Sequence, residues 1–254
     1  MANPAAISRR SAPAPPLLLC ISLLTCSLAQ QPPSLQQGVV PAFLFDWLDG
    51  KSTFTAGDTA VITVMALDLP DDPSLRASLS FWVSVKGKKG NSTYIADVVE
   101  HRDGPDSWRI TFVPLRAGNF FALVADERFT VGESALEFKV AAAGVHPSAS
   151  RAAWTFDDAH VVVGSRAFVS VFPRDAFGNG IARGDDMPDY FRVSGSFANG
   201  SAVELLYFHY NGWIQEGRIS LEFVSYVAGV FLVHVYGDNR ELRDSPLTLT
   251  VNPG

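Results

Sequence analysis

Cysteine is almost absent from this chain of 254 residues, which contains only Cys20 and Cys26. Both lie within the first thirty residues, so the remainder has no thiol that could form a disulfide, attack a substrate or bind a metal. A secreted domain without disulfides has to be held together by its hydrophobic core. That requirement favours domains of about 100 residues over a small disulfide-rich scaffold.

Concentrated charge of one sign is also lacking. The sequence has 20 Lys and Arg against 26 Asp and Glu, which gives a formal net charge of −6 at pH 7. Its basic residues are scattered, whereas binding to nucleic acid or to a lipid surface needs basic residues gathered on one face. Hydrophobic residues make up 47% of the chain, which is enough to bury substantial cores. We therefore expect a globular protein that does not bind nucleic acid.

Long hydrophobic runs are missing as well, since the apolar run of residues 17–24 is too short to cross a membrane. Arg9 and Arg10 precede this run and small residues follow it, which predicts a cleaved signal peptide over residues 1–29. Residues 30–38 are expected to form a flexible N-terminus. The predicted location is the secretory pathway, and then the extracellular space or the outer face of the plasma membrane, where attachment would need an anchor absent from this chain.

Sequence motifs that carry chemistry are not found. The histidines show no HxxxH or HExxH spacing, and the sequence has neither a Gly-x-Ser-x-Gly elbow nor a phosphate-binding loop. We therefore predict a non-enzymatic protein with no cofactor and no metal. The five histidines are His101, His146, His160, His209 and His234.

The sequence does contain many short runs in which apolar and polar residues alternate. Such runs occupy residues 58–66, 109–113, 120–124 and 136–140. Clusters of Gly, Asp, Asn and Pro separate them about every ten residues, and no segment of a dozen residues carries a helical apolar stripe. The pattern predicts an all-β fold of immunoglobulin-like sandwiches.

The second half of the sequence repeats the first. When Ala117 and Gly118 are set on Ala228 and Gly229, the apolar positions of the neighbouring strands coincide. Nearer the N-terminus the spacing between matching positions is four residues shorter, which predicts a longer loop in the second copy. The coinciding positions are Ile110 with Leu221, Phe112 with Phe223, Phe120 with Phe231, Val124 with Val235, and Val140 with Val251.

This internal repeat predicts two tandem domains. We name residues 39–142 repeat 1 and residues 148–254 repeat 2. The linker between them, residues 143–147, combines small residues with a glycine and a proline, which suits a short extended connection. A repeat of about 105 residues is much longer than the unit of a solenoid, so each copy should fold around its own core.

The end of repeat 2 resembles a filamin-type immunoglobulin repeat. Residues 228–235 match its Gly-x-aromatic-x-Val-x-Val strand, and residues 244–254 match the Gly-Ser-Pro-Phe turn and last strand, with Asp244 in place of Gly and Leu247 in place of Phe. The glycine lets the strand turn in tightly. The proline lies at a strand edge, where its missing N–H is harmless.

Both repeats together resemble the N-terminal region of the plant Gamete Expressed Two family. The segments that carry the resemblance are residues 47–58, 87–94, 112–118 and 173–179. It implies a sperm-surface protein with filamin-like repeats outside the cell, a C-terminal anchor, and a role in gamete attachment during double fertilisation. The implied partner is a protein on another cell surface, or a second copy of the same protein.

The resemblance also implies a binding edge, because filamin-type repeats often accept a partner strand along the groove between strands C and D. In repeat 2 these strands are expected at residues 190–194 and 203–209. The alternative, that the apolar run of residues 203–210 is buried by a contact between the repeats, has equal weight. The candidate edge residues are Tyr190, Val203, Leu206, Phe208 and His209.

Two N-glycosylation sequons occur, at Asn91 and at Asn199. Both have turn-like surroundings, which predicts exposure and modification in the secretory pathway.

Two other motifs are interpreted as loops. The Arg-Gly-Asp triplet that ends at Asp185 is expected to be a solvated turn rather than an integrin-binding site. The stretch from Asp175 to Asn179 lacks the alternating acidic series of a calcium loop, and its Gly178 and Asn179 predict a tight turn after strand B.

Two alternatives to adhesion remain, a carbohydrate- or cell-wall-binding module and a structural spacer. The first needs tryptophans on an open face, whereas their placement near equivalent strands favours packing in the cores. The five tryptophans are Trp47, Trp82, Trp108, Trp154 and Trp213.

Overall fold

The structure, a computed structural model, describes residues 42–88, 95–127, 135–156 and 159–254. The predicted signal peptide, the flexible N-terminus and the sequon at Asn91 lie outside the described residues. Within the described ranges most regular structure is β-strand, with one short α-helix and one short 3-10 helix. None of the helices there is long and apolar enough to cross a membrane.

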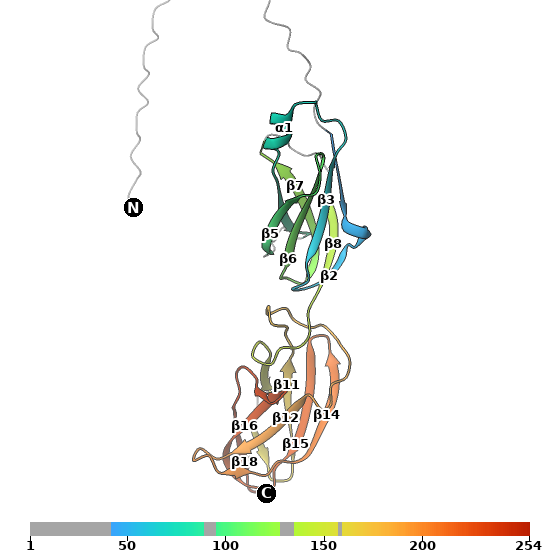
Figure 1. Ribbon diagram of the computed structural model, residues 1–254. Helices are drawn as coiled ribbons and strands as arrows, with labels where there is room; N and C mark the ends of the chain where they lie inside the picture. The colour runs from blue at the N-terminus through green and yellow to red at the C-terminus, as the bar shows by residue number, and fades with distance from the viewer. Residues whose placement is uncertain (1–41, 89–94, 128–134, 157–158) are drawn as a thin grey trace, which may run out of the picture. The chain divides into compact units, whose positions relative to one another are not determined.

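Repeat 1 consists of two four-stranded sheets, with strand orders β1-β3-β6-β5 and β2-β8-β7-β4 (Figure 1). Neighbouring strands are antiparallel except for β2 and β8, which run parallel. The elements are β1 (Phe43–Trp47), η1 (Leu48–Gly50), β2 (Thr53–Thr55), β3 (Ala60–Ala66), α1 (Pro73–Ser78), β4 (Phe81–Gly87), β5 (Ile95–Arg102), β6 (Ser107–Pro114), β7 (Gly118–Asp126) and β8 (Leu136–Ala141).

Repeat 2 has the same plan with two additions. One sheet has the order β10-β18-β16-β12-β13, with β17 also paired to β16, and the other has the order β14-β15-β11-β9 (Figure 1). The two-residue strands β13 and β17 have no counterpart among the described strands of repeat 1. The elements are β9 (Arg151–Trp154), β10 (His160–Val162), β11 (Arg166–Phe172), β12 (Phe191–Ser196), β13 (Ala202–Val203), β14 (Leu206–Gln215), β15 (Arg218–Val224), β16 (Gly229–Gly237), β17 (Arg240–Glu241) and β18 (Leu247–Asn252).

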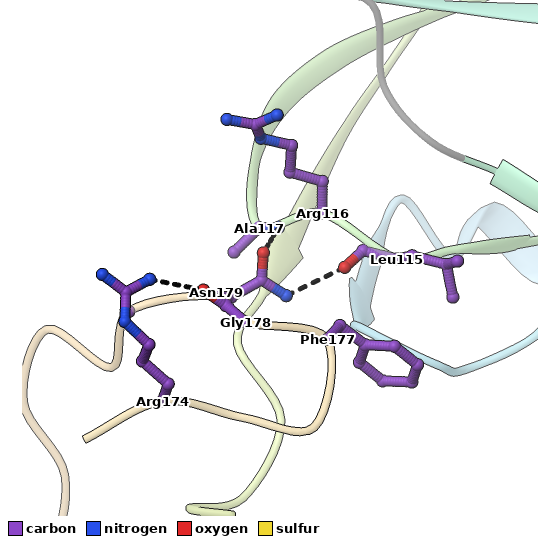
Figure 2. Close-up of a pocket in the computed structure, with 8 residues that line it drawn as sticks. Leu115, Arg116, Ala117, Arg174, Phe177, Gly178 and Asn179 are labelled. Atoms are coloured by element: carbon purple, nitrogen blue, oxygen red, sulfur yellow. Dashed lines mark hydrogen bonds between the residues drawn. The ribbon is translucent and has the colours of Figure 1, made fainter. Parts of the chain in front are cut away.

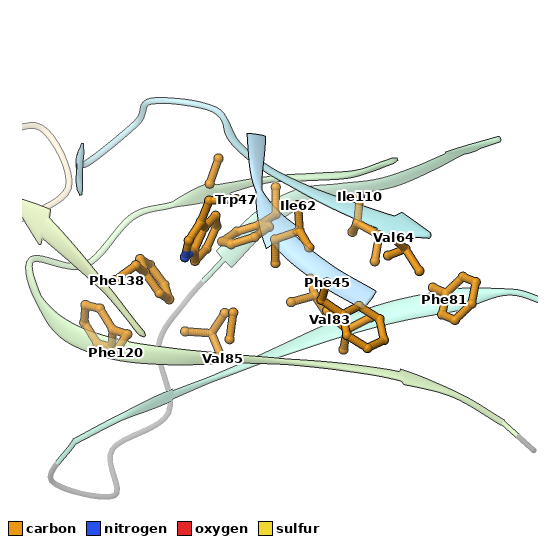
Figure 3. Packing of buried hydrophobic residues seen from close by; sticks show 14 of the residues in the cluster. Phe45, Trp47, Ile62, Val64, Phe81, Val83, Val85, Ile110, Phe120 and Phe138 are labelled. Carbon is orange, nitrogen blue, oxygen red and sulfur yellow. The ribbon is translucent and has the colours of Figure 1, made fainter. Parts of the chain in front are cut away.

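The alternation seen in the sequence decides which side chains enter the core. In β6 every second residue is buried, including Trp108, Ile110 and Phe112. Phe112 packs against Trp47 of the same sheet and Phe138 of the opposite sheet. Trp47 and Phe138 pack with ring centroids 5.3 Å apart, and each lies within 6.3 Å of Phe112. Figure 3 shows Trp47, Phe120 and Phe138 among the buried side chains of repeat 1. Each aromatic pair contributes about 0.5–1.5 kcal/mol beyond the burial of its area.

The two copies agree strand by strand. The alignment of Gly118 with Gly229 carries β7 and β8 onto β16 and β18, and the alignment of Trp47 with Trp154 carries β2 onto β10. The difference of four residues between these alignments is found between β3 and β4 in repeat 1 and between β11 and β12 in repeat 2, where residues 67–80 correspond to residues 173–190. Each repeat also encloses its own hydrophobic cluster. The prediction of two tandem all-β sandwiches is confirmed.

Helix α1 was not indicated by apolar periodicity, because six residues are too few to show a helical stripe. A local signal was available in the order Asp72, Pro73 and Ser74. The Asp72 carboxylate accepts a hydrogen bond from Ser74 N at 2.8 Å, and Pro73 occupies the first helical position, where its missing N–H costs nothing.

Candidate functional site

Strand β14 carries most of the binding edge predicted for repeat 2. It is the edge strand of its sheet, and its residues Tyr207 and Phe208 are 72% and 39% exposed. The pairing with β15 shifts register between Leu206 and His209, and Tyr207 has a positive φ of 53°. This irregularity turns two neighbouring aromatic side chains towards solvent, although they would alternate in a regular strand.

The other two predicted edge residues lie elsewhere. Val203 is buried in β13, which pairs with β12 in the opposite sheet. Tyr190 precedes β12 and donates a hydrogen bond from its hydroxyl to Val145 O at 3.2 Å. Burial, helped by the charge of Asp238, raises the pKa of Tyr190 above its usual range. The five residues predicted as one edge therefore lie in three places: on β14, in β13 of the opposite sheet, and before β12. β13 covers the edge of β12 beside Gly195.

Strand β4 is the counterpart of β12 in repeat 1, and among the described strands it forms the edge of its sheet. Its seven residues pair with β7 in continuous register, and no other strand of the described chain pairs with it. Phe81, Val83 and Val85 point into the core, whereas Trp82 is 49% exposed. One backbone amide at the start of the strand is already hydrogen-bonded, because Phe81 N donates to a carboxylate oxygen of Glu100 at 2.9 Å.

The turn after β11 connects the two repeats through two hydrogen bonds of the Asn179 side chain, which we call the bracket (Figure 2). Asn179 Nδ2 donates to Leu115 O at 2.9 Å, and Ala117 N donates to Asn179 Oδ1 at 2.9 Å. One side-chain amide of repeat 2 thus satisfies two backbone groups of repeat 1. A cavity of about 620 Å³ lies beside the bracket, with Arg116 and Arg174 among its lining residues.

Asp175 holds Asn179 in this orientation. Its fully buried carboxylate accepts hydrogen bonds from the backbone amides of Phe177, Asn179 and Ala143, and from Asn179 Nδ2. Gly178 has a φ of 82° and donates its amide to Asp175 O, which closes the tight turn expected from the sequence. With four donors, this carboxylate is a structural acceptor. The described residues contain no group of three His, Cys, Asp or Glu side chains that could hold a metal ion.

A polar cluster on repeat 2 was missed by the sequence reasoning. Ser196 Oγ lies 2.9 Å from His234 Nε2, and His234 Nδ1 lies 2.8 Å from a carboxylate oxygen of Glu241. Ser245 Oγ donates to the same carboxylate oxygen at 2.8 Å. The connection runs from β12 through β16 to β17, so its members are far apart in the sequence and no motif could reveal it.

The Ser196–His234–Glu241 order is the hydrogen-bond order of a hydrolytic triad, but its surroundings differ from those of an active site. The amide that follows the serine, on Phe197, is donated to Ser201 O at 2.8 Å, so it is not free to stabilise an oxyanion. The cluster connects strands of one sheet, and we interpret it as structural.

The tryptophans are mainly packing residues. Trp47 and Trp108 are buried in repeat 1, and Trp154 and Trp213 are partly buried in repeat 2. Trp82 is the one exposed tryptophan among the five. A carbohydrate-binding face would therefore rest on this single ring. The Arg-Gly-Asp loop is exposed and is fixed to β14 by a hydrogen bond from Trp213 Nε1 to Asp185 O at 3.3 Å.

A family model described as the GEX2 N-terminal Ig-like domain matches the sequence twice, over residues 41–140 and residues 148–251. The chain belongs to this family. Each match covers one sandwich, so the GEX2 family assigns the immunoglobulin-like fold to both repeats and confirms the resemblance noted from the sequence.

The sequence is also similar to Protein GAMETE EXPRESSED 2 of Arabidopsis thaliana. The two sequences are 34% identical over 139 residues, which cover 54% of this chain and 15% of the relative. The chain thus matches only a small part of that longer protein.

Several solved structures are also similar to the chain, among them the adhesin FdeC and the Lin-41 filamin domain. The adhesin FdeC of Escherichia coli has 17% sequence identity and a TM-score of 0.46, covering 83% of this chain and 64% of FdeC. The Lin-41 filamin domain has 16% identity and a TM-score of 0.33, covering 44% of this chain and the whole of that domain.

Proposed function

We propose that the chain is an extracellular, non-enzymatic adhesion module that binds a protein on another cell. Membership of the GEX2 family and the name of the Arabidopsis relative support a finer proposal, namely that this adhesion contributes to gamete attachment during plant double fertilisation. The observation that supports binding to a protein is the open edge of β4.

An edge strand binds a partner when its backbone groups are free and its geometry is regular. Strand addition then gives affinity through main-chain hydrogen bonds and specificity through alternate side chains. Proteins normally protect such edges with bulges, prolines, charged side chains or covering strands. β4 has one of these features, the exposed Lys86 near its end. β4 has no proline, and its register with β7 is unbroken from Phe81 to Gly87. It is therefore a better acceptor than the edge of repeat 2 that the resemblance had suggested.

The predicted edge on repeat 2 contributes differently in this proposal. Its C strand, β12, is partly covered by β13, and the register of β14 shifts at three places. Bulged strands resist regular strand addition. Leu206, Phe208 and His209 therefore provide side-chain contacts in the proposal, while β4 provides the main-chain contact.

The test compares charged substitutions on the two edges. Trp82→Lys and Ser84→Lys place cations on the outward face of β4 without touching its buried residues. Phe208→Lys does the same on β14. In plants whose gametes carry each variant, we expect the β4 variants to reduce gamete attachment strongly and Phe208→Lys to reduce it less. Circular dichroism of each purified variant checks that the fold is retained.

The other possible functions predict different outcomes. Loss with Trp82→Ala but not with Ser84→Lys would indicate sugar stacking on one ring and support the carbohydrate-binding alternative. Loss only with Phe208→Lys would move the binding site to repeat 2. Normal attachment with every folded variant would contradict binding through either edge and support a structural spacer.

A further inference from the structure

A small surface of repeat 1 contacts the turn that follows β11 in repeat 2. We call it the socket and define it as Gly57, Leu115 and Ala117. The last two residues form the backbone hydrogen bonds to Asn179, each 2.9 Å long. At the first position, a Cβ added to Gly57 would approach ring carbons of Phe177 to 2.9 Å. A glycine is needed there both for this close approach and for its φ of 92°.

Repeat 2 has the same three positions at its own C-terminal end. The alignment that sets Trp47 on Trp154 carries the socket glycine to Gly164. The alignment that sets Gly118 on Gly229 carries the two bracketed positions, Leu115 and Ala117, to Tyr226 and Ala228. These are the alignments that superimpose the strands of the two repeats, so the correspondence follows from the repeat itself.

The backbone has the same geometry in both places. Gly57 N donates to Pro114 O at 2.9 Å, and Gly164 N donates to Ser225 O at 2.9 Å. Gly164 has a φ of 81°, in the same left-handed region as its counterpart. The end of repeat 2 therefore carries a second socket whose backbone matches the first.

The surroundings of the second socket are apolar. Tyr226 is 56% exposed and lies against Tyr207, with ring centroids 6.5 Å apart, and Val227 is exposed where repeat 1 has Arg116. An uncovered repeat normally ends in a polar face, since exposed apolar groups cost solubility. An apolar end with a socket indicates a surface that is covered by a partner.

We propose that this second socket binds another immunoglobulin-like repeat, one that presents a turn of the Asp-x-Phe-Gly-Asn type. In this arrangement the asparagine of the turn accepts a hydrogen bond from Ala228 N and donates one to Tyr226 O, as Asn179 does at the first socket. A Cβ on Gly164 would lie 3.3 Å from the ring of Tyr226. The aromatic residue of the turn therefore packs on that tyrosine rather than on the glycine.

The experiment extends the chain by a second copy of residues 144–254, placed after Gly254. The alignment of Gly118 with Gly229 also sets Ala143 on Gly254, so this fusion reproduces the natural spacing between socket and turn. The measurement is hydrogen exchange of the Ala228 amide by NMR. We expect exchange about tenfold slower in the extended chain than in the original chain, the change that one protected hydrogen bond gives.

Asn179→Ala in the added copy is the decisive variant, because it removes the bracket and leaves the core intact. It should return the Ala228 amide to its original exchange rate. The Ala117 amide, bound to the original Asn179, should not change and serves as a control in the same molecule. Protected amides in the core strands of the added copy verify that it folds.

A second variant tests the apolar surroundings independently of the added copy's folding. Tyr226→Lys combined with Val227→Lys, both in the original repeat 2, should also abolish the protection of Ala228. If the extended chain with a folded added copy exchanges Ala228 as fast as the original chain, the proposal is wrong. Equal protection with asparagine and with alanine in the added turn would also overturn it.

Discussion

Trp47 and Trp154, which occupy equivalent positions in the two repeats, donate the same hydrogen bond. The indole of the first reaches Glu137 O at 3.1 Å and that of the second reaches Thr248 O at 3.1 Å. In each repeat this bond ties the end of the first strand to the last strand of the opposite sheet. The repetition of a specific side-chain contact shows that the two copies share a packing scheme as well as a strand order.

The aromatic core of repeat 1 should be sensitive to truncation at Phe138. Its ring packs against four other aromatic rings, so Phe138→Ala leaves a cavity. We expect the free energy of unfolding of repeat 1 to fall by about 3–5 kcal/mol in urea denaturation. The control Tyr207→Ala removes an exposed ring and should change stability by less than about 0.5 kcal/mol. Equal effects would contradict the assignment of the core.

The buried carboxylate of Asp175 should be necessary for the junction turn. Asp175→Ala leaves three backbone amides and the Asn179 side chain without their acceptor. We expect a loss of about 3 kcal/mol or more in the free energy of unfolding of repeat 2, since unsatisfied buried donors are costly. Asp185→Ala, in the exposed loop nearby, is the matched control and should be nearly neutral. A small effect of Asp175→Ala would mean that water replaces the carboxylate.

The ion pair between Asp103 and Arg109 should make the stability of the fold depend on pH. The Arg109 guanidinium, which donates hydrogen bonds to both carboxylate oxygens at 2.7 and 3.0 Å, lowers the pKa of Asp103. A carboxylate with a lowered folded-state pKa stabilises the fold above its unfolded pKa, and this contribution disappears as pH falls through the folded value. NMR titration should therefore show a higher pKa for Asp103 in Arg109→Gln. Asp72, whose pKa is lowered mainly by Ser74, should titrate as before.

The Ser196–His234–Glu241 cluster should not behave as a nucleophile. We expect no covalent labelling of the chain by a fluorophosphonate probe, because the Phe197 amide is already paired and cannot serve as an oxyanion donor. Mass spectrometry after incubation with the probe provides the measurement. Labelling that disappears in Ser196→Ala would show that the chain has hydrolase chemistry.

Asn199 should carry an N-glycan when the chain is made in a plant secretory pathway. The residue is exposed at a turn in which Gly200 has a φ of 85°, and its Oδ1 accepts hydrogen bonds from Ser201 N and Oγ. We expect a mass loss on enzymatic deglycosylation, and Asn199→Gln should remove one glycan. Asn211→Gln, at an exposed asparagine outside any sequon, should remove none.

Fold class, repeat number and the positions of the regularly alternating strands follow from the amino-acid sequence alone. These properties depend on local alternation and on a repeat that can be read position by position. Phe112 and Phe223, or Val140 and Val251, are buried because they alternate with polar neighbours in strands whose limits are set by turn residues. The turn at Gly178 was equally readable, since its glycine takes up a left-handed conformation that other residues avoid.

Tertiary packing decides which strands pair and which side chains come into contact when they are far apart in the sequence. The apolar run of residues 203–210 gave no sign that Val203 joins one sheet while Phe208 joins the other, because β-propensity does not specify a partner strand. Likewise, no local sequence pattern predicts that Asn179 donates a hydrogen bond to Leu115 O or that His234 lies between Ser196 and Glu241. Such contacts arise when chain segments far apart in sequence are brought together by the packing of two sheets, and their geometry exists only in the folded chain.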